Sequence, residues 1–256
     1  MNTDSKHEQG RRDFLKHGAA AATVAVAPGV LLHAVNAKPR EEPVTDAVRW
    51  GMLVDTTKCA DGCNACVEAC DQENGIDMML KPASADEAEW ERQKPRWIRK
   101  VKVKDNLTEK VTNLPLMCVH CEHPPCVDVC PTGASFRRAD GIVMVNRHTC
   151  IGCRYCMMAC PYKARSFIHE SVQYQLTAVP RGKGCVESCT FCVHRLDRGQ
   201  TTTACQDACS REGHKAIVFG DLRDPQSEVS QVLKRYPSVA LRADLKLNPG
   251  VRFAGI

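Results

Sequence analysis

The cysteines constrain this chain more than any other feature, because sixteen of its seventeen cysteines stand in four groups of four. In chain order the groups are Cys59, Cys63, Cys66 and Cys70; Cys118, Cys121, Cys126 and Cys130; Cys150, Cys153, Cys156 and Cys160; and Cys189, Cys192, Cys205 and Cys209. Each group ends in C-x3-C, so the chain reads as a repeated module. Cys185 is left over.

The third group has the C-x2-C-x2-C-x3-C spacing of bacterial ferredoxins and is followed by Pro161. Three thiolates close together on a curled loop can reach three of the four iron atoms of a cube. The fourth cysteine points away and binds the second cluster of a pair. The spacing therefore predicts [4Fe–4S] clusters, with proline ending the following helical turn.

Disulfides and zinc remain open as alternative roles for the cysteines. Disulfides persist in exported proteins, but the cysteine count is odd and close triplets have no obvious purpose in a disulfide framework. Zinc sites favour separate pairs that form one tetrahedral set, rather than triplets with a distant fourth ligand. An exported binding protein stabilised by disulfides or zinc is the alternative of a different class.

The segments between the groups predict an α+β fold of small modules wrapped round inorganic cores. Alternating apolar and charged residues predict a strand at 97–103, with a turn at 105–106 and a partner strand near Val111. Further short strands are expected at 48–54, within 139–145 and at 216–219, and single helical turns at 67–70 and 157–160. Only 5% of residues are aromatic, which fits clusters that fill core space.

The N-terminus has the features of an export signal. Arg11 and Arg12 precede Phe-Leu-Lys, an apolar run follows, and small residues end it near Ala37. This pattern predicts a twin-arginine signal peptide over residues 1–37, and a retained membrane anchor is the alternative. The twin-arginine route exports folded proteins, as a protein loaded with cofactor in the cytosol requires.

The remaining residues, 38–256, are expected to form one four-cluster domain. No apolar run after Ala37 approaches the length of a membrane span. The last residues, 236–256, carry no chemical motif and are expected to be a tail that wraps the surface or docks to a partner.

The motifs resemble those of the four-cluster iron–sulfur subunits of membrane-anchored oxidoreductases. The resemblance rests on residues 118–126 (CVHCEHPPC), 140–143 (DGIV), 189–195 (CTFCVHR) and 220–225 (GDLRDP) and covers about residues 49–233. Within this family the chain is most similar to the iron–sulfur subunit of the membrane complex associated with dissimilatory sulfite reductase.

The resemblance implies duplicated ferredoxin-like modules related by a pseudo-twofold axis. The outer module would comprise 48–75 and 180–222, and the inner module 112–170. It implies four ligand sets: Cys59, Cys63, Cys66 and Cys209; Cys70, Cys189, Cys192 and Cys205; Cys118, Cys121, Cys126 and Cys160; and Cys130, Cys150, Cys153 and Cys156. Each set takes its fourth thiolate from the paired group.

Some residues depart from this pattern or lie beside it. The first group has C-x3-C where the family has C-x2-C, so an extra residue either bulges at Gly62 or displaces Cys59. Cys185 is expected not to be a ligand. His120 and His123 are expected to hydrogen-bond near cluster sulfurs rather than bind iron.

Four arginines close to the cluster motifs are candidates for partner docking, with an ordinary solvated surface as the alternative. They are Arg137, Arg138, Arg147 and Arg154.

These features favour a subunit that relays single electrons and performs no substrate chemistry. The resemblance implies an integral membrane quinone-interacting partner, further cytochrome or iron–sulfur subunits, and a periplasmic position peripheral to the membrane. A second hypothesis attaches the same clusters to a molybdopterin-type reductase of polysulfide, tetrathionate or dimethyl sulfoxide, or to a formate-dependent nitrite reductase. Neither a nucleic acid nor a small-molecule substrate is expected.

The formal net charge of +5 describes the chain without clusters. Removal of the signal leaves +4, and four oxidised clusters with their thiolates add about −8. The loaded protein is therefore expected near −4, so the basic composition offsets buried negative clusters rather than indicating anionic partners.

Overall fold

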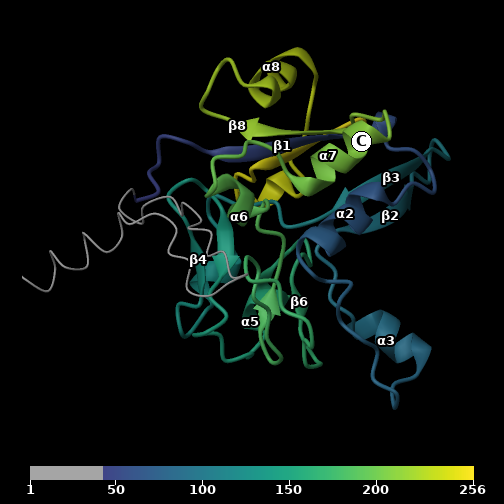
Figure 1. The fold of residues 1–256 in the computed structure, drawn as a ribbon. Helices are drawn as coiled ribbons and strands as arrows, with labels where there is room; N and C mark the ends of the chain where they lie inside the picture. Colours follow the sequence, from purple (N-terminus) through teal and green to yellow (C-terminus); the bar gives the residue numbers. More distant parts are fainter. Residues whose placement is uncertain (1–42) are drawn as a thin grey trace, which may run out of the picture. The chain divides into compact units, whose positions relative to one another are not determined.

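Three strands from distant parts of the chain form the main sheet of the computed structural model, which describes residues 43–256 (Figure 1). The signal peptide predicted for residues 1–37 lies outside these described residues. The central strand, β1 (Trp50–Asp55), pairs antiparallel with β8 (Ile217–Asp221) and parallel with β9 (Val251–Ala254). β1 and β8 correspond to strands predicted from the sequence.

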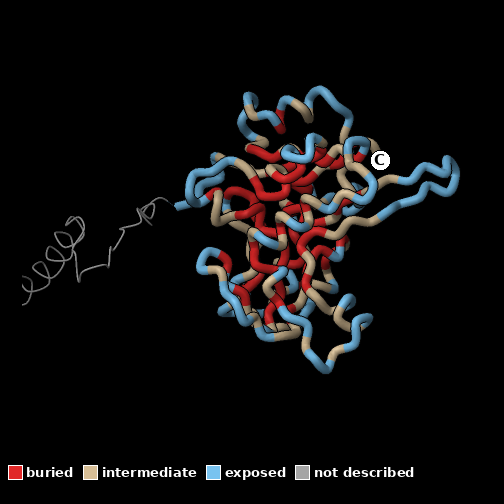
Figure 2. The backbone as a smooth tube through the Cα atoms, turned by 45° about the vertical axis from the view of Figure 1, so that its right-hand side comes forward, coloured by how far each residue is buried: buried red, intermediate tan, exposed pale blue. Residues whose placement is uncertain are grey.

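Alternate residues of β1 face opposite sides of this sheet, and both sides are covered. Leu53 packs with Val229 of α8 (Glu228–Arg235), which lies along one face in Figure 1. Met52 and Val54 belong to the main core on the other side, where eight of the grouped cysteines also lie. The thiols are therefore part of the core, and Figure 2 shows its buried residues (red) running through the middle of the described domain.

The C-terminal segment does not merely wrap the surface. Val251 and Phe253 of β9 are fully buried, and the backbone of Val239 pairs with that of Phe253. The expectation of a surface tail over residues 236–256 is thus wrong for its last strand. The sequence shows no alternation strong enough to reveal it, because β9 has only four residues.

The predicted hairpin is present as β2 (Arg99–Lys104) and β3 (Val111–Leu116), paired antiparallel from Arg99 opposite Leu116 to Lys104 opposite Val111. Its tip is exposed and extends from the core in Figure 2. Two smaller hairpins follow: β4 (Ser135–Arg137) with β5 (Val143–Val145), and β6 (Ser166–Phe167) with β7 (Val186–Glu187).

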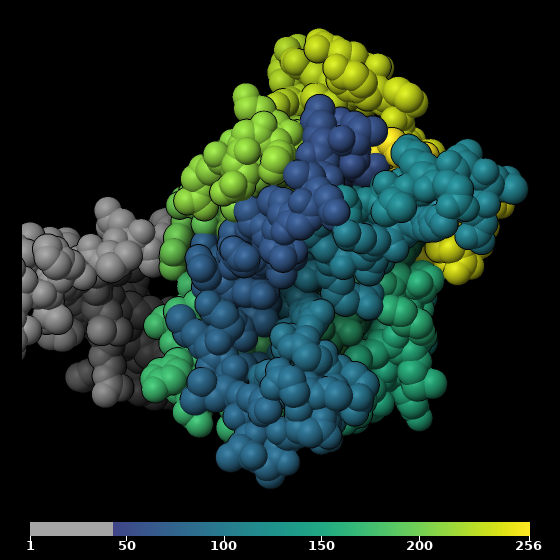
Figure 3. Space-filling model, turned by 90° about the vertical axis from the view of Figure 1, so that its right-hand side faces the viewer, coloured from purple at the N-terminus to yellow at the C-terminus, as the bar shows by residue number. Residues whose placement is uncertain are grey.

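Two pairs of short helices carry cysteines. α2 (Ala65–Glu73) packs on α7 (Ala204–Arg211), and α4 (Pro125–Asp128) packs on α5 (Tyr155–Ala159). The remaining elements are η1 (Thr56–Lys58), α3 (Glu87–Gln93), α6 (Val193–Leu196) and η2 (Ala243–Leu245). The segment with α3 (blue) covers the lower end of the face seen in Figure 3. The fold is thus a mixture of helices and small sheets, as predicted.

Within residues 43–256, no helix combines the length and the apolar character that crossing a bilayer requires.

Candidate metal centres

Three cysteines of the first group lie beside the last cysteine of the fourth group. Cys59, Cys63 and Cys66 line one hollow together with Cys209 of α7. Gly62 adopts φ +73° in the intervening turn, and a side chain there would meet nothing within 4 Å. The extra residue of the first motif is therefore accommodated at Gly62, and Cys59 is not displaced from the hollow.

Burial and mutual repulsion disfavour free thiolates in this hollow. Burial raises the pKa of Cys66 to about 12, Lys100 opposes the rise, and the charges of Cys59, Cys209 and Cys63 add to it. Four ionised thiols can be held in such a place only with a compensating cationic group. A bound iron cluster would supply that charge.

The second set joins Cys70, at the end of the first group, to three cysteines of the fourth. Burial raises the pKa of the Cys70 thiol well above its usual value, and the charges of Cys189, Cys205 and Cys192 raise it further. Phe191 and Cys192 both have positive φ, 54° and 51°, so the loop curls tightly before α6. These four thiols thus lie close to one another.

The third set combines the second and third groups. Cys118, Cys121 and Cys126 line a hollow with Cys160. Burial raises the pKa of Cys118 and of Cys121 to about 12, with added repulsion from neighbouring thiols of the same set.

The fourth set is the most open. Burial raises the pKa of Cys156, with added repulsion from Cys150 and Cys130. Cys153 is the exposed thiol of this set, whereas Cys150 and Cys130 are half-buried.

Electrostatic contacts between sets give their order. The charge of Cys66 in the first set raises the pKa of Cys205 in the second. The charge of Cys118 in the third set likewise raises the pKa of Cys189 in the second. The charge of Cys156 in the fourth set raises the pKa of Cys126 in the third. The sets therefore follow one another from first to fourth, with the fourth nearest the solvent.

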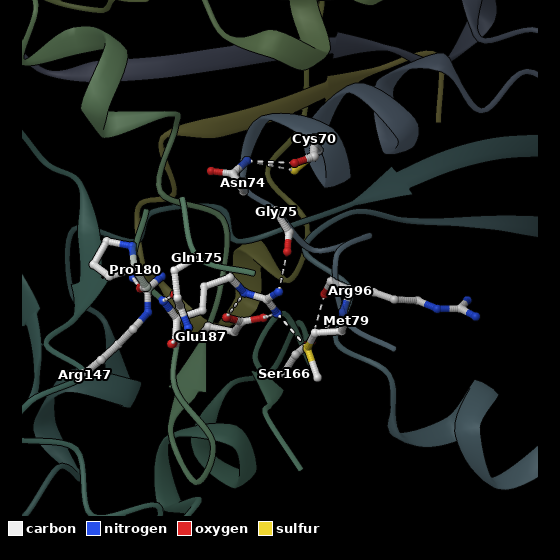
Figure 4. Close-up of polar contacts among 11 residues, drawn as sticks. Cys70, Asn74, Gly75, Met79, Arg96, Arg147, Ser166, Gln175, Pro180 and Glu187 are labelled. Atoms are coloured by element: carbon white, nitrogen blue, oxygen red, sulfur yellow. Dashed lines mark hydrogen bonds and ion pairs between the residues drawn. The ribbon is translucent and has the colours of Figure 1, made fainter. Parts of the chain in front are cut away.

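Several sulfurs accept hydrogen bonds from the surrounding chain. The backbone N–H of Ser135 donates to Cys130 Sγ at 3.3 Å, and that of Ala216 donates to Cys209 Sγ at 3.3 Å. The side-chain amide of Asn74 donates to Cys70 Sγ at 3.6 Å (Figure 4). Such bonds favour the charged thiolate and tune a cluster that it binds.

The spacing of the thiols fits a cluster better than a single ion. Among residues 43–256, no three Cys, His, Asp or Glu side chains lie close enough together to hold one metal ion, as a tetrahedral zinc site requires. The seventeen cysteines, all in the described part, are free thiols. Four thiols round one hollow are the donor set of a cubane cluster.

His120 lies where the second and third sets meet. Its ring packs against that of Phe191, with 3.7 Å between centroids and the planes tilted by 31°, and both side chains are buried. The N–H of Val143 donates to Nδ1 at 3.0 Å, so the proton of the neutral ring is on Nε2, which is buried and has no partner. Burial lowers the pKa of His120 to about 3. The expected bond to a cluster sulfur remains a prediction for His120, whereas His123 is exposed.

Cys185 lies beside the third group rather than with the fourth, which it precedes in sequence. Its thiol donates to the carbonyl of Arg147 at 3.3 Å, and after burial the charge of Cys150 contributes most to raising its pKa. The loop before β7 places Cys185 beside the third group, and no pattern in the sequence predicts this position.

Three of the four candidate docking arginines have partners within the domain. Arg138 bonds Asp140 and Asp197, Arg147 donates to the carbonyl of Pro180, and the guanidinium of Arg154 lies 3.9 Å from the centre of the Phe167 ring. These contacts favour structural roles.

Sequence reasoning missed two cations beside the sets, the half-buried Lys100 and the buried Arg165. Lys100 donates to backbone carbonyls of Ala60 and Cys63 beside the first set. Arg165 donates to Cys126 Sγ. Nothing in a single sequence distinguishes these residues from surface cations, because only the fold brings them to the thiols. A groove of about 470 Å³ between α2, α3 and β2 contains no cysteine and is separate from the sets.

Two matches to a known domain family cover the cysteine motifs. The 4Fe–4S dicluster domain matches residues 58–134 and, separately, residues 110–221.

Curated relatives extend over nearly the whole chain. The chain is 41% identical to the Hdr-like menaquinol oxidoreductase iron–sulfur subunit 1 of Archaeoglobus fulgidus, over 95% of this chain and 97% of the relative. It is 37% identical to protein NrfC of Escherichia coli K12, over 93% of this chain and 92% of the relative. It is also 34% identical to a subunit of the tetrathionate reductase of Salmonella typhimurium, over 81% of this chain and 73% of the relative.

Proposed function

Because the chain belongs to the family of 4Fe–4S dicluster iron–sulfur subunits of membrane oxidoreductases, we propose that it relays single electrons along four [4Fe–4S] clusters. The observation that carries this proposal is the gathering of sixteen thiols into four consecutive sets. The subunit is a non-catalytic relay, and a bound cluster supplies the reversible one-electron chemistry.

Each cluster takes three thiolates from one cysteine group and one from its partner group. The first holds Cys59, Cys63, Cys66 and Cys209; the second Cys70, Cys189, Cys192 and Cys205; the third Cys118, Cys121, Cys126 and Cys160; and the fourth Cys130, Cys150, Cys153 and Cys156. The packed helix pairs, α2 with α7 and α4 with α5, support two modules related by a pseudo-twofold axis, with outer residues 48–75 and 180–222 and inner residues 112–170.

The fourth set marks the end of the series that faces a partner. The fourth cluster would exchange electrons at the surface, since Cys153 is exposed and Ile151, Tyr155 and Met158 are 68%, 56% and 72% exposed around it. Apolar side chains around an exposed ligand suit a dry contact with another redox subunit.

The partner is a membrane quinone-interacting subunit, with further cytochrome or iron–sulfur subunits. The menaquinol oxidoreductase relative supports this choice. The predicted twin-arginine signal supports export and a position on the periplasmic side of the membrane. The resemblance to the sulfite reductase-associated subunit supports a role in sulfur metabolism.

A second candidate is the same relay within a reductase of the tetrathionate or NrfC-containing type. Identities of 34% and 37% to such relatives favour it. The subunits that copurify decide between the two candidates: a molybdopterin subunit supports the second.

The relay is tested on protein purified anaerobically with its clusters. We expect about 16 iron and 16 sulfide ions per chain, and four paramagnetic signals on stepwise reduction. Cys59→Ala and Cys209→Ala should alter the same signal, although the two residues belong to different sequence groups. A colourless protein, or different signals altered by these two variants, contradicts the assignment.

Cys185→Ala is the matched control. It removes a thiol that is also buried and that lies beside Cys150, but that belongs to none of the four proposed ligand sets. All four signals and the full iron content should remain. Loss of one cluster in this variant would make Cys185 a ligand.

A further inference from the structure

Arg165 is a buried cation that the relay itself does not explain. It lies in the loop between Cys160 and β6, and only 5% of its surface is exposed. A guanidinium cannot lose its proton in a protein, so this site holds a full positive charge.

Arg165 contacts a cysteine sulfur and a serine hydroxyl rather than a carboxylate. Nη2 donates to Cys126 Sγ at 3.0 Å and to Ser135 Oγ at 2.8 Å, while the buried Nη1 has no partner. Its charge interacts with the thiols of Cys126, Cys118 and Cys156. Within the described part of the chain, no carboxylate forms an ion pair with it.

Arg181 shows how this chain otherwise buries an arginine. Its guanidinium is 1% exposed and bonds both oxygens of Glu187, at 2.9 and 2.6 Å, and the carbonyl of Gly75 (Figure 4). Burial of an unpaired charge is strongly unfavourable, so Arg165 also needs a counter-charge. The anions in its surroundings are the cysteine thiolates.

These thiolates belong to two neighbouring sets. Cys126 and Cys118 are in the third set, and Cys156 is in the fourth. Arg165 therefore lies between the third and fourth sets, with one unused donor, Nη1, in the same buried space.

We propose that Arg165 is a shared counter-ion of the third and fourth clusters, which positions their thiolates and makes both clusters easier to reduce. Reduction adds one electron to a cluster and so one negative charge, and a fixed cation nearby stabilises the reduced form. The hydrogen bond to Cys126 acts in the same direction. This inference rests on the proposed ligand sets.

The test measures the reduction potential of each cluster by following its paramagnetic signal during a redox titration of the intact loaded protein. In Arg165→Gln the reduction equilibrium constants of the third and fourth clusters should each fall at least tenfold, which is about 59 mV for one electron. The first and second clusters should keep their potentials. Unchanged potentials in all four clusters, or equal shifts in all four, overturn the proposal.

Lys100→Gln is the matched control, because Lys100 is a cation beside the first set. It should lower the potential of the first cluster and leave the third and fourth unchanged. A shift of the third or fourth cluster in this control would show that total charge, not position, sets the potentials, and would overturn the proposal.

If the glutamine variant fails to bind clusters, Arg165→Lys tests the proposal instead. It keeps the charge and loses the planar hydrogen-bonding geometry. We expect four clusters, with the potentials of the third and fourth unchanged or only slightly lowered because the charge is kept. Shifts in the first and second clusters, or decreases of tenfold or more in the reduction equilibrium constants of the third and fourth despite the retained charge, would overturn the proposal. If the unaltered protein holds fewer than four clusters, the proposed relay fails, and not the role of Arg165.

Discussion

At the scale of single residues, the loops that present the thiols depend on backbone conformations that most residues avoid. His120, Phe191 and Arg154 have φ of 47°, 54° and 64°, in the left-handed region. A left-handed residue with a side chain costs about 1–2 kcal/mol. The chain tolerates this cost in the loops that curl round the thiols, and also in turns farther away, such as those at Glu109 and Arg242.

Gly152, between Cys150 and Cys153, is a position where only glycine fits. Its φ is +71°, and a Cβ would overlap the carbonyl oxygen of Gly184. Gly152→Ala should therefore destabilise the protein by about 2–5 kcal/mol, the sum of backbone strain and overpacking. The readout is the denaturant concentration at which cluster absorbance is lost.

Gly133→Ala is the control for this substitution. Gly133 has φ +66° near Cys130 of the same set, but a Cβ there meets nothing within 4 Å. The expected cost is only the backbone strain, about 1–2 kcal/mol. Equal effects of the two substitutions would mean that the contact with Gly184 does not matter.

At the scale of elements, one network of charges joins the three helices α2, α6 and α7. Glu73 at the end of α2 accepts hydrogen bonds from Arg195 Nε and from His194, both of α6, at 2.7 Å. Arg195 also bonds Asp207 of α7 at 2.8 Å. These helices carry or adjoin ligands of the first and second sets, so the network fixes how those sets face each other.

Glu73→Ala should lower the free energy of unfolding by about 1–2 kcal/mol, since the network is partly exposed. Hydrogen bonding from Arg195 holds the pKa of Glu73 below its ordinary value of 4.5. The stabilisation is therefore present above about pH 4.5 and is lost as the pH falls through the lowered pKa. Chemical unfolding at pH 7 and below about pH 4 measures both effects.

Glu91→Ala provides the comparison, because Glu91 also pairs with two cations, Lys94 and Arg96, but at the surface. Its removal should change stability by less than about 0.5 kcal/mol. If Glu73→Ala lowers the free energy of unfolding no more than Glu91→Ala does, the network does not stabilise the fold.

At the scale of the whole described domain, the sets form a series in which the fourth set is the more exposed end. Met158 and Ile151 beside Cys153 are exposed apolar residues at that end. Met158→Glu should slow electron exchange with the redox subunit proposed to dock at this end about tenfold or more, because it places a charge in a contact that must exclude water. Stopped-flow reduction by the reconstituted partner subunit measures this rate, and the four cluster signals should be unaltered.

Leu107→Glu is the control for Met158→Glu, because it adds the same charge away from the fourth set. Leu107 is 94% exposed at the tip of the β2–β3 hairpin. The rate should stay within about twofold of the unaltered protein, because a charge on a solvated tip disturbs no contact. A rate that falls in the Leu107 variant and not in the Met158 variant places the contact at the hairpin instead.

The spacing of the cysteines contained most of the information about the clusters, because ligands of one ferredoxin loop are close in sequence. The β2–β3 hairpin was equally predictable from its alternating residues. The position of Cys185, the burial of Arg165 and the strand β9 were not predictable. Each depends on contacts between residues far apart in the chain, and no local pattern records such contacts.

The parallel pairing of β9 with β1 has a consequence for biosynthesis. Thr56, just after β1, bonds the carbonyl of Ala254 across a separation of 198 residues, and the carbonyl of Val119 in the second cysteine loop receives the N–H of Gly250. The main sheet and this loop therefore cannot be completed until residues 250–254 have left the ribosome. Long-range closure of this kind is slow. Final folding of the main sheet, and of the loop that presents Cys118 and Cys121, is therefore expected only after the chain has been synthesised nearly to residue 254.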